Sequence, residues 1–306
     1  MNEPLQSTVR DNVSVGALTY DRTAAVRYVV GAWLDDGSVV QELLLHRGRK
    51  KPSMPSRQVA TARVANDVIY GGIIIHHYGH FLFETLSRYW FLKHSRRRAV
   101  WHLLPDAPKL TQWQKEIFSI LRLEVDRGDL ILQPTRFDKL TIPQAGAELW
   151  TSLHPEQVDA MGIFPFHKPI AGRKLWLSRS LLTRGGVQQE QALEALLERT
   201  DWTIIRPETL PVIEQLRLLR DAEIIAGFDG SAFHTLMLGR DVRAKVVIVP
   251  RGGTDKISAT YGVIAKAKGL SQSILPARIL RVRGAGRGAV HRLQRPGELA
   301  EALNSV

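Results

Sequence analysis

The chain has 306 residues, of which 44% are hydrophobic and 24% charged, the balance of a folded globular protein rather than a disordered one. It contains no cysteine, so disulfide bonds and thiolate metal sites are excluded. The formal net charge of +12 favours anionic partners, namely nucleic acids, acidic lipid headgroups or phosphorylated small molecules.

The length exceeds that of one ordinary compact core, which predicts two domains. The first residues lack the basic and apolar regions of a secretory signal, and no apolar run is long enough to span a bilayer. We therefore expect a cytoplasmic protein, soluble or peripheral on the inner face of the plasma membrane. No nucleic-acid-binding motif accompanies the basic residues, so binding to nucleic acid would rest on charge alone and is not expected.

The first half of the chain alternates strand and helix signals after an initial hairpin. The pattern predicts a hairpin over 25–46, a basic loop over 47–62, strands at 68–75, 99–104, 130–132 and 139–142, and helices over 77–94 and 111–121. Residues 151–173 contain several prolines and glycines and little periodicity, which indicates a boundary between domains at 1–160 and 161–306.

The second half alternates more strictly, which predicts a parallel, doubly wound sheet with ligands at the carboxyl ends of its strands. The strands are expected at 174–177, 202–205, 223–226 and 245–249, and the helices over 189–199, 210–220 and the segment after 230. A short strand, a basic glycine-rich stretch and a last helix over 296–304 follow. That helix could pack back on the first domain.

The turn at 227–238 predicts an anion site. It joins a buried strand to a helix start, where unpaired N–H groups and the helix dipole attract negative charge. Gly227 and Gly230 allow a sharp turn, and Ser231 is expected to cap the helix. Ala232 and His234 lie in its first turn. Many such turns carry glycine for backbone reasons only.

The predicted helix over 77–94 carries His77, His80, Glu84 and Arg88 on one stripe, while the rest of it is apolar. A buried stripe of this kind must face partners or a cleft, because an unpaired buried charge is costly. One alternative is an internal Glu84–Arg88 pair with satisfied histidines. A zinc site is less favoured, because the spacing is not the His-Glu-x-x-His arrangement.

Polar groups also follow two strands of the second half. Arg179 comes at the end of the strand at 174–177, with Arg184 five residues later, and two guanidinium groups suit a diphosphate. Solvated surface arginines are the alternative. Glu208 follows the strand at 202–205 and could accept sugar hydroxyls.

Three of these segments, taken in order, resemble glycosyltransferase family 61. His77, His80, Glu84 and Arg88 are similar to its Asn-x-x-His-x-x-x-Glu-x-x-x-Arg helix. Ser178, Arg179 and Arg184 resemble its Ser-Arg segment, and Gly227, Gly230, Ser231 and Thr235 its Gly-x-His-Gly-Ala/Ser-x-x-x-Asn turn. The Glu214–Gln215 pair is also typical of the family. The chain departs from the pattern at His77, Asp229 and Thr235, which replace Asn, His and Asn.

The resemblance implies an α/β fold of GT-B type, with two Rossmann-like doubly wound domains facing each other across a cleft. The first would hold a glycan or lipid-linked glycan acceptor, and the second a nucleotide-sugar donor. It implies inverting transfer in capsule, exopolysaccharide or lipopolysaccharide assembly. The alternatives are a degenerate nucleotide-sugar-binding protein without transfer activity, suggested by Asp229 and Thr235, and a basic nucleic-acid-binding protein.

In the mechanism that follows, Arg179, Arg184 and the turn at Gly230, Ser231, Ala232 and His234 would neutralise the departing diphosphate. No divalent metal or other cofactor is then expected, which fits the absence of an Asp-x-Asp cluster. His80 would be the base, oriented by Glu84, with Asp229 and Glu84 itself as competing candidates. Arg88 would keep Glu84 ionised, and His77 and Glu208 would support the acceptor. No oligomeric state is predicted.

Overall fold

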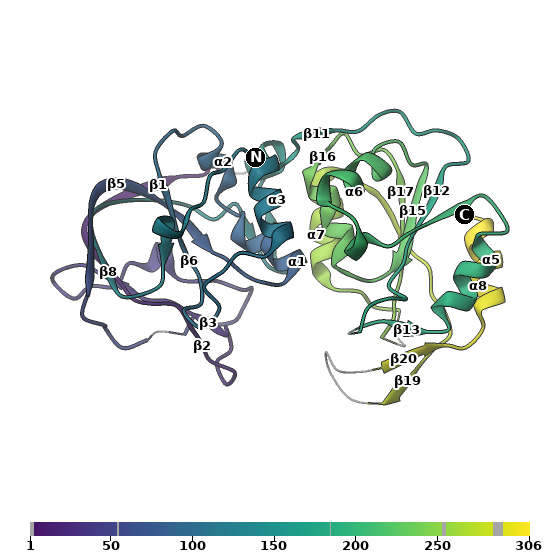
Figure 1. Ribbon diagram of the computed structural model, residues 1–306, viewed down its shortest axis with the longest axis horizontal. Helices are drawn as coiled ribbons and strands as arrows, with labels where there is room; N and C mark the ends of the chain where they lie inside the picture. Colours follow the sequence, from purple (N-terminus) through teal and green to yellow (C-terminus); the bar gives the residue numbers. More distant parts are fainter. Residues whose placement is uncertain (1–2, 54, 184, 253–254, 284–289) are drawn as a thin grey trace. The chain divides into compact units, whose positions relative to one another are not determined.

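The computed structural model describes residues 3–53, 55–183, 185–252, 255–283 and 290–306. The chain has a mixed α/β fold and divides into two compact units, Met1–Met161 and Gly162–Val306 (Figure 1). Each unit is built on its own sheet and is described separately.

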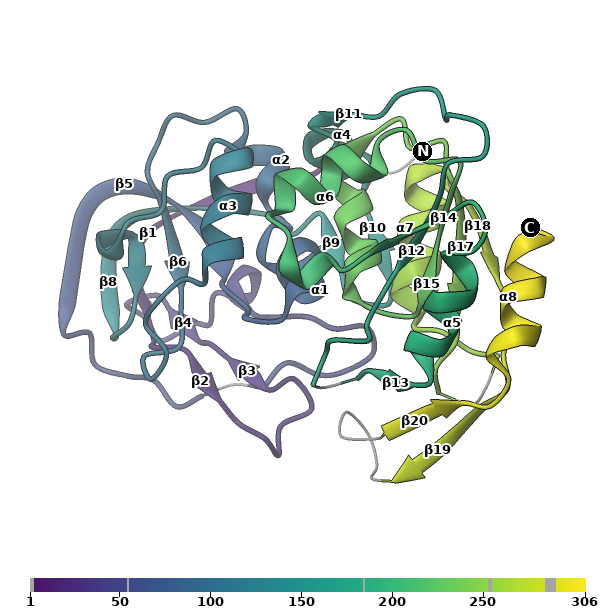
Figure 2. The same ribbon diagram turned by 45° about the vertical axis from the view of Figure 1, so that its right-hand side comes forward.

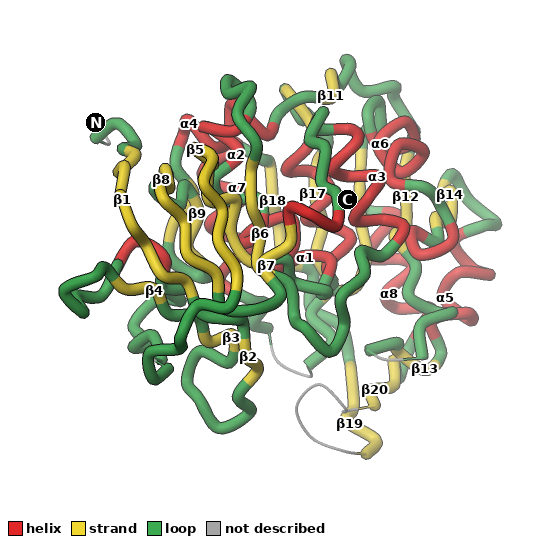
Figure 3. The backbone as a smooth tube through the Cα atoms, turned by 60° about the vertical axis from the view of Figure 1, so that its left-hand side comes forward, coloured by secondary structure: helices red, strands yellow, loops and turns green. Residues whose placement is uncertain are grey.

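The first unit contains a six-stranded mixed sheet in the order β4-β1-β8-β5-β6-β7 (Figure 3). Four neighbouring strands, β8, β5, β6 and β7, are parallel, and β1 is antiparallel to β8 and to β4. The bounds are β1 Ser7–Val15, β4 Ala32–Trp33, β5 Ala62–Ile73, β6 Ala99–His102, β7 Leu130–Ile131 and β8 Thr135–Pro143. Val68, Tyr70, Phe137 and Leu140, among others, form a core against this sheet.

Short elements surround this sheet. The helical ones are η1 Gln41–Leu43, α1 Tyr78–His80, η2 Phe81–Thr85, α2 Tyr89–Leu92, α3 Gln112–Ile120, η3 Arg127–Asp129 and α4 Pro155–Met161. The small strand pairs are β2 Thr19–Tyr20 with β3 Tyr28–Val29, and β9 Ala147–Glu148 with β10 Ser152–Leu153. The hairpin expected over 25–46 is reduced to a tight turn in which Trp33 bridges Val39.

The expected continuous helix over 77–94 is wrong: α1 runs into a π-helical turn, η2, and the chain then breaks before α2. In the π turn the Leu86 N–H group donates to the Phe81 carbonyl, five residues earlier. Thr85 holds this turn against the end of β5, because its hydroxyl donates to the Ile73 carbonyl (2.7 Å) and accepts from the Ile75 N–H (3.0 Å). The extra residue rotates everything after it, so the predicted stripe is not continuous.

The second unit contains a five-stranded, wholly parallel sheet in the order β14-β12-β15-β17-β18. The bounds are β12 Lys174–Leu177, β14 Trp202–Ile205, β15 Ile224–Phe228, β17 Lys245–Val249 and β18 Ser271–Ile274. Three of these strands have the predicted bounds. Parallel strands buried on both faces give short continuous apolar runs, which are easy to recognise in a sequence.

Helices cover both faces of this sheet, with α6 and α7 on one side and α5 and α8 on the other (Figures 1 and 2). The bounds are α5 Glu190–Leu197, α6 Val212–Leu219, α7 Ala259–Lys268 and α8 Pro296–Asn304. Leu299 and Leu303 of α8 pack with Leu193 and Leu197 of α5 in the core of this unit. The last helix therefore packs in the core of its own unit.

The remaining elements of the second unit are short. They are the strands β11 Phe164–Pro165, β13 Val187–Gln188, β16 Gly239–Arg240, β19 Ile279–Arg283 and β20 Val290–Leu293, and the 3-10 turns η4 Pro207–Thr209 and η5 Ser231–Leu238. The helix expected after Gly230 is this 3-10 segment, and Gly230 is its N-cap. The prediction that Ser231 caps it is wrong, since Ser231 is the first helical residue.

Candidate functional site

The main polar cluster of the second unit lies where its strand order reverses. The chain leaves β12 toward β14 on one side and returns to β15 on the other. In parallel sheets this point opens a crevice at the carboxyl ends of the two strands, where ligands bind. Arg179 follows β12 and Gly230 follows β15, so both lie at this point, as the sequence predicts.

Arg179 and Gly230 are in close contact. A Cβ atom placed on Gly230 would lie 2.1 Å from Arg179 Nη1, which no side chain could tolerate without displacing the guanidinium group. Gly230 has an extended φ of −172°, so glycine is needed here for space and not for backbone conformation. Arg179 Nε also donates to the Gly185 carbonyl (3.0 Å), which holds the side chain across the end of β15.

Arg251 is a second arginine of this cluster that the sequence reasoning missed. Its Nη1 donates to the same Gly185 carbonyl (2.8 Å), and its Nε to the Asp229 carbonyl (2.6 Å). The Asp229 carboxylate accepts from both the main-chain N–H and Nε of Arg251, each at 3.0 Å. Asp229 therefore fixes Arg251 instead of opposing an anion with a free negative charge. Arg251 comes two residues after the end of β17, just as Arg179 comes two residues after the end of β12. The same rule of position that predicted Arg179 would therefore have found Arg251.

Two guanidinium groups on one carbonyl oxygen form a site suited to an anion. Burial, together with the neighbouring Arg251 cation, lowers the pKa of Arg179. Asp229 compensates the charge of Arg251, whereas Arg179 forms no ion pair among the described residues, so an anion bound beside the two groups would supply its missing counter-charge. Guanidinium forks match phosphate oxygens, so a phosphate or diphosphate is the anion that this geometry suits.

A buried carboxylate supports the Arg179 segment from behind. Glu190, at the start of α5, is 1% exposed, and its Oε1 accepts from the Arg179 main-chain N–H (2.9 Å) and from Trp176 Nε1 (3.1 Å). Within the described residues its Oε2 has no partner. Burial raises the pKa of Glu190 to about 7, against the opposing effect of these two hydrogen bonds. Nothing in the sequence distinguishes Glu190 from a surface helix residue.

The other predicted residues of this unit differ in their exposure. Ser231 and Ala232 are half-buried in the first turn of η5, while His234 is buried with its ring 5.4 Å from that of Tyr261. Burial raises the pKa of Tyr261, whose hydroxyl lies near Asp229 and Gly230. Glu208 is exposed on η4. Arg184 lies outside the described residues.

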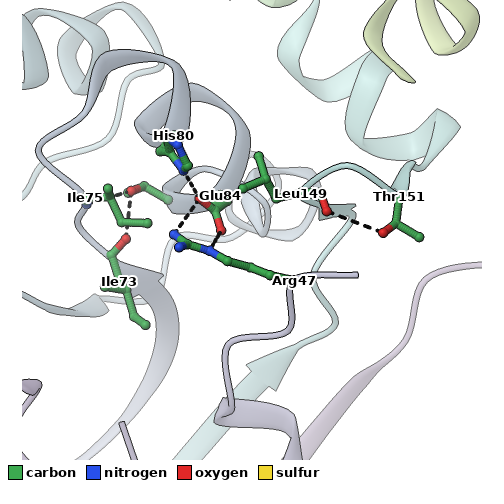
Figure 4. A network of polar contacts seen from close by, with 8 residues as sticks. Arg47, Ile73, Ile75, His80, Glu84, Leu149 and Thr151 are labelled. Atoms are coloured by element: carbon green, nitrogen blue, oxygen red, sulfur yellow. Dashed lines mark hydrogen bonds and ion pairs between the residues drawn. The ribbon is translucent and has the colours of Figure 1, made fainter. Parts of the chain in front are cut away.

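The first unit has its own polar cluster, centred on Glu84 (Figure 4). Arg47 forms a bidentate ion pair with this carboxylate, in which Nε donates to Oε1 at 2.6 Å and Nη2 donates to Oε2 at 2.9 Å. His80 Nδ1 lies 2.5 Å from Glu84 Oε2. The Glu84 side chain is only 2% exposed, so the full hydrogen bonding offsets the cost of burying its charge. His77 is exposed at the start of α1, its ring 4.7 Å from that of His80.

The predicted pairing of Arg88 with Glu84 is wrong, in both the functional and the purely structural interpretation. Arg88 Nε donates to the Pro143 carbonyl (2.8 Å), its Nη2 to the Glu42 carbonyl (3.1 Å), and its guanidinium lies over the Tyr70 ring. The π turn between the two residues explains the difference, because it moves Arg88 off the face that carries Glu84. Arg47, from a loop far away in the sequence, takes the expected place.

Among the residues that the structure describes, no group of three or more His, Asp or Glu side chains could hold a metal ion. No helix in the described ranges is long and apolar enough to cross a membrane.

A known protein family matches the central part of the chain. A family profile described as Glycosyltransferase 61 matches residues 78–249, more than half of the sequence. The chain belongs to the glycosyltransferase 61 family. The matched region of this family member includes His80, Glu84, Arg179 and Gly230, while Arg47 and Arg251 lie outside it. A search of curated protein sequences finds no match.

Proposed function

We propose that this glycosyltransferase moves a sugar, with inversion and without a metal, from a nucleoside diphosphate donor to a glycan acceptor of a cell-surface polysaccharide. The observation that carries the proposal is the convergence of Arg179 and Arg251 on one carbonyl oxygen beside Gly230. This pair lies at the edge of a parallel sheet where nucleotides commonly bind. Membership of the family supports glycosyl transfer in general.

In this proposal the two arginines stabilise the nucleoside diphosphate as it leaves. Negative charge grows on the diphosphate in the transition state, and fixed guanidinium groups lower the barrier most when they are already in place. Asp229 and the Gly185 carbonyl hold Arg251, and Gly185 also holds Arg179, so neither side chain must be ordered on binding. Metal independence is part of the proposal, because these guanidinium groups would supply the positive charge that a divalent cation supplies at other sites.

His80 is the proposed base. The Glu84 carboxylate can only accept, so the 2.5 Å contact places the His80 proton on Nδ1. Nε2 then carries the lone pair that takes the proton of an acceptor hydroxyl. Arg47 neutralises Glu84, which keeps the carboxylate from drawing that proton onto itself. A histidine oriented by a buried carboxylate is a common solution to this task.

The arrangement that brings donor and acceptor together is proposed to be of GT-B type, with two Rossmann-like domains facing across a cleft. We place the protein in the cytoplasm, peripheral on the inner face of the plasma membrane, where lipid-linked acceptors lie. The net charge of +12 supports attraction to an anionic surface. Leu280 and Val282 of β19 are 52% and 45% exposed, and Leu280 lies opposite Arg292. Sedimentation with phosphatidylglycerol vesicles tests this association.

Donor turnover tests the function directly. Purified protein is incubated with UDP-, GDP-, ADP- and dTDP-sugars, with and without EDTA, and release of the nucleoside diphosphate is measured. Release that survives EDTA supports the proposal. Nucleotide binding without release identifies a degenerate binding protein, and binding that instead scales with phosphate count on DNA and falls steeply with salt identifies a nucleic-acid-binding protein.

A further inference from the structure

A cavity in the first unit carries the inference. Its volume is about 480 Å³, within the range of small-molecule sites, and it is lined by the ends of β5 and β8 and by the η1 region. The strand order of the first unit reverses between β5 and β8, because β6 lies on the other side of β5. The cavity therefore lies at a topological switch point, like the arginine cluster of the second unit.

The charges around this cavity are balanced. Among the lining side chains, Glu42 is neutralised by Arg10 at 2.6 Å, and Glu84 by Arg47 at 2.6 Å. One carboxylate, Glu148, and one guanidinium, Arg88, remain, and the imidazole of His46 completes the ionisable groups of the lining. A cavity with no excess charge selects a neutral ligand, since an anion or a cation would leave one of these groups opposed.

Arg88 has N–H groups available to donate hydrogen bonds into the cavity. It is 8% exposed, burial lowers its pKa, and in the described part of the chain it has no carboxylate partner. Two of its N–H groups are used by main-chain carbonyls, which leaves others for a ligand in the cavity. Glu148 complements it: no side-chain hydrogen bond occupies its carboxylate among the described residues, and a carboxylate only accepts. A hydroxyl group can meet both demands, because it donates and accepts.

The turn beside the cavity carries a strained aromatic residue. Trp150 lies between Glu148 and Ser152, which both line the cavity, and has a φ of 68°, a region that bulky residues rarely adopt. Its side chain is 39% exposed. The Lys50 ammonium lies over one face of its ring, 5.0 Å from the centroid, and Figure 4 shows the Leu149–Thr151 turn next to the Arg47–Glu84 pair. Because Lys50 occupies one face of the indole, the C–H side of a sugar ring would stack on the opposite face.

We infer that this cavity binds a neutral sugar residue of the acceptor glycan, with hydroxyl groups on Glu148 and Arg88 and a ring face against Trp150. The inference rests on the proposed function, because it names the acceptor class of the same enzyme. It also separates the roles within the first unit: His80 acts on the reacting hydroxyl, while the cavity holds a sugar beside it.

The test uses the full-length protein and an array of neutral hexose, uronic-acid and amino-sugar oligosaccharides. Neutral glycans are expected to bind, and the best of them is then titrated calorimetrically at millimolar concentration. Loss of a charged hydrogen-bond partner in Glu148→Gln should raise its dissociation constant about tenfold, and Trp150→Ala should raise it similarly. Glu124→Gln, an exposed control in the same unit, should leave it unchanged.

Three results would each overturn the inference. The protein could prefer uronic-acid glycans and bind them more tightly as Glu148→Gln, it could fail to bind neutral glycans, or the two variants could bind neutral glycans like wild type. Unfolding midpoints show whether the variants are folded. Inorganic pyrophosphate is titrated in parallel: if it binds while neutral glycans do not, the cavity inference fails and the proposed donor site stands. Failure of both ligands rejects the proposed function itself.

Discussion

Replacing Gly230 by alanine tests the proposed donor site with one methyl group. The added Cβ would lie 2.1 Å from Arg179 Nη1 and 3.0 Å from its Cζ, so the guanidinium must retreat by at least about 1.3 Å, the difference from an ordinary contact of 3.4 Å. The backbone is not strained, because φ at Gly230 is extended. Gly230→Ala therefore removes Arg179 from the site while leaving its charge in the molecule.

The expected magnitude follows from the hydrogen bonds that Arg179 would make to the diphosphate. A hydrogen bond to a charged group contributes about 1.5–3 kcal/mol, so the dissociation constant of pyrophosphate should rise about ten- to hundredfold. The unfolding midpoint should change little, because the displaced group is the far end of a flexible side chain. Isothermal calorimetry with inorganic pyrophosphate, and then with UDP, GDP and ADP, measures the effect.

Gly262→Ala is the matched control. Nothing lies within 4 Å of a Cβ at this position of α7, so pyrophosphate affinity should be unchanged and the helix stabilised by up to about 1 kcal/mol. A double-mutant cycle with Arg179→Ala completes the design. The reasoning is refuted if Gly230→Ala binds pyrophosphate like wild type, or if it weakens binding equally in the Arg179→Ala background.

Three further predictions concern stability. Double-mutant cycles should show strong coupling between Arg47 and Glu84, with Arg47→Met alone costing about 3–5 kcal/mol, and coupling near zero between Arg88 and Glu84; the reverse result in urea unfolding would contradict the observed pairing. Thr85→Val should lower the free energy of unfolding by about 1–3 kcal/mol in the same assay, because it leaves two buried main-chain groups at the end of β5 without their hydrogen-bond partner. A decrease below about 0.5 kcal/mol would mean that the threonine does not hold the π turn. The free energy of unfolding should fall as pH rises from about 4.5 to 7, because the pKa of Glu190 is raised to about 7 in the folded state and the native protein therefore binds a proton that the unfolded chain has lost. Glu190→Gln should remove this slope, which is about 1.4 kcal/mol per pH unit at most. A slope that is unchanged in that variant would assign the pH dependence to other groups.

The second unit could be predicted well because its sheet is parallel. Strands buried on both faces leave continuous runs of β-branched and apolar residues, such as Lys245–Val249, and the residues that follow them must lie at one edge. Arg179 and Gly230 were found by this rule. Arg251 obeys it too, two residues after the same run, and was missed because the rule was applied only to the strands at 174–177, 202–205 and 223–226.

The first unit could not be predicted to the same depth, for two physical reasons. The helix over 77–94 is apolar nearly all round, so its sequence does not show the π turn that changes its phase. That turn depends on the Thr85 hydroxyl and the end of β5, a contact between elements. The partner of Glu84 is Arg47, 37 positions earlier in a loop, and no local pattern connects the two.

Both clusters contain a buried carboxylate that holds neighbouring polar groups in position. Glu84 holds Arg47 and His80 through its two oxygens, and Glu190 holds the main chain of Arg179 through one. Glu84 has a guanidinium partner, so its negative charge is compensated where it is buried. Glu190 has none, and its second oxygen is unpartnered within the described residues, which is why burial raises its pKa. It follows that a rise in pH toward neutrality ionises a buried carboxylate that has no guanidinium partner, which strains the support of the arginine cluster.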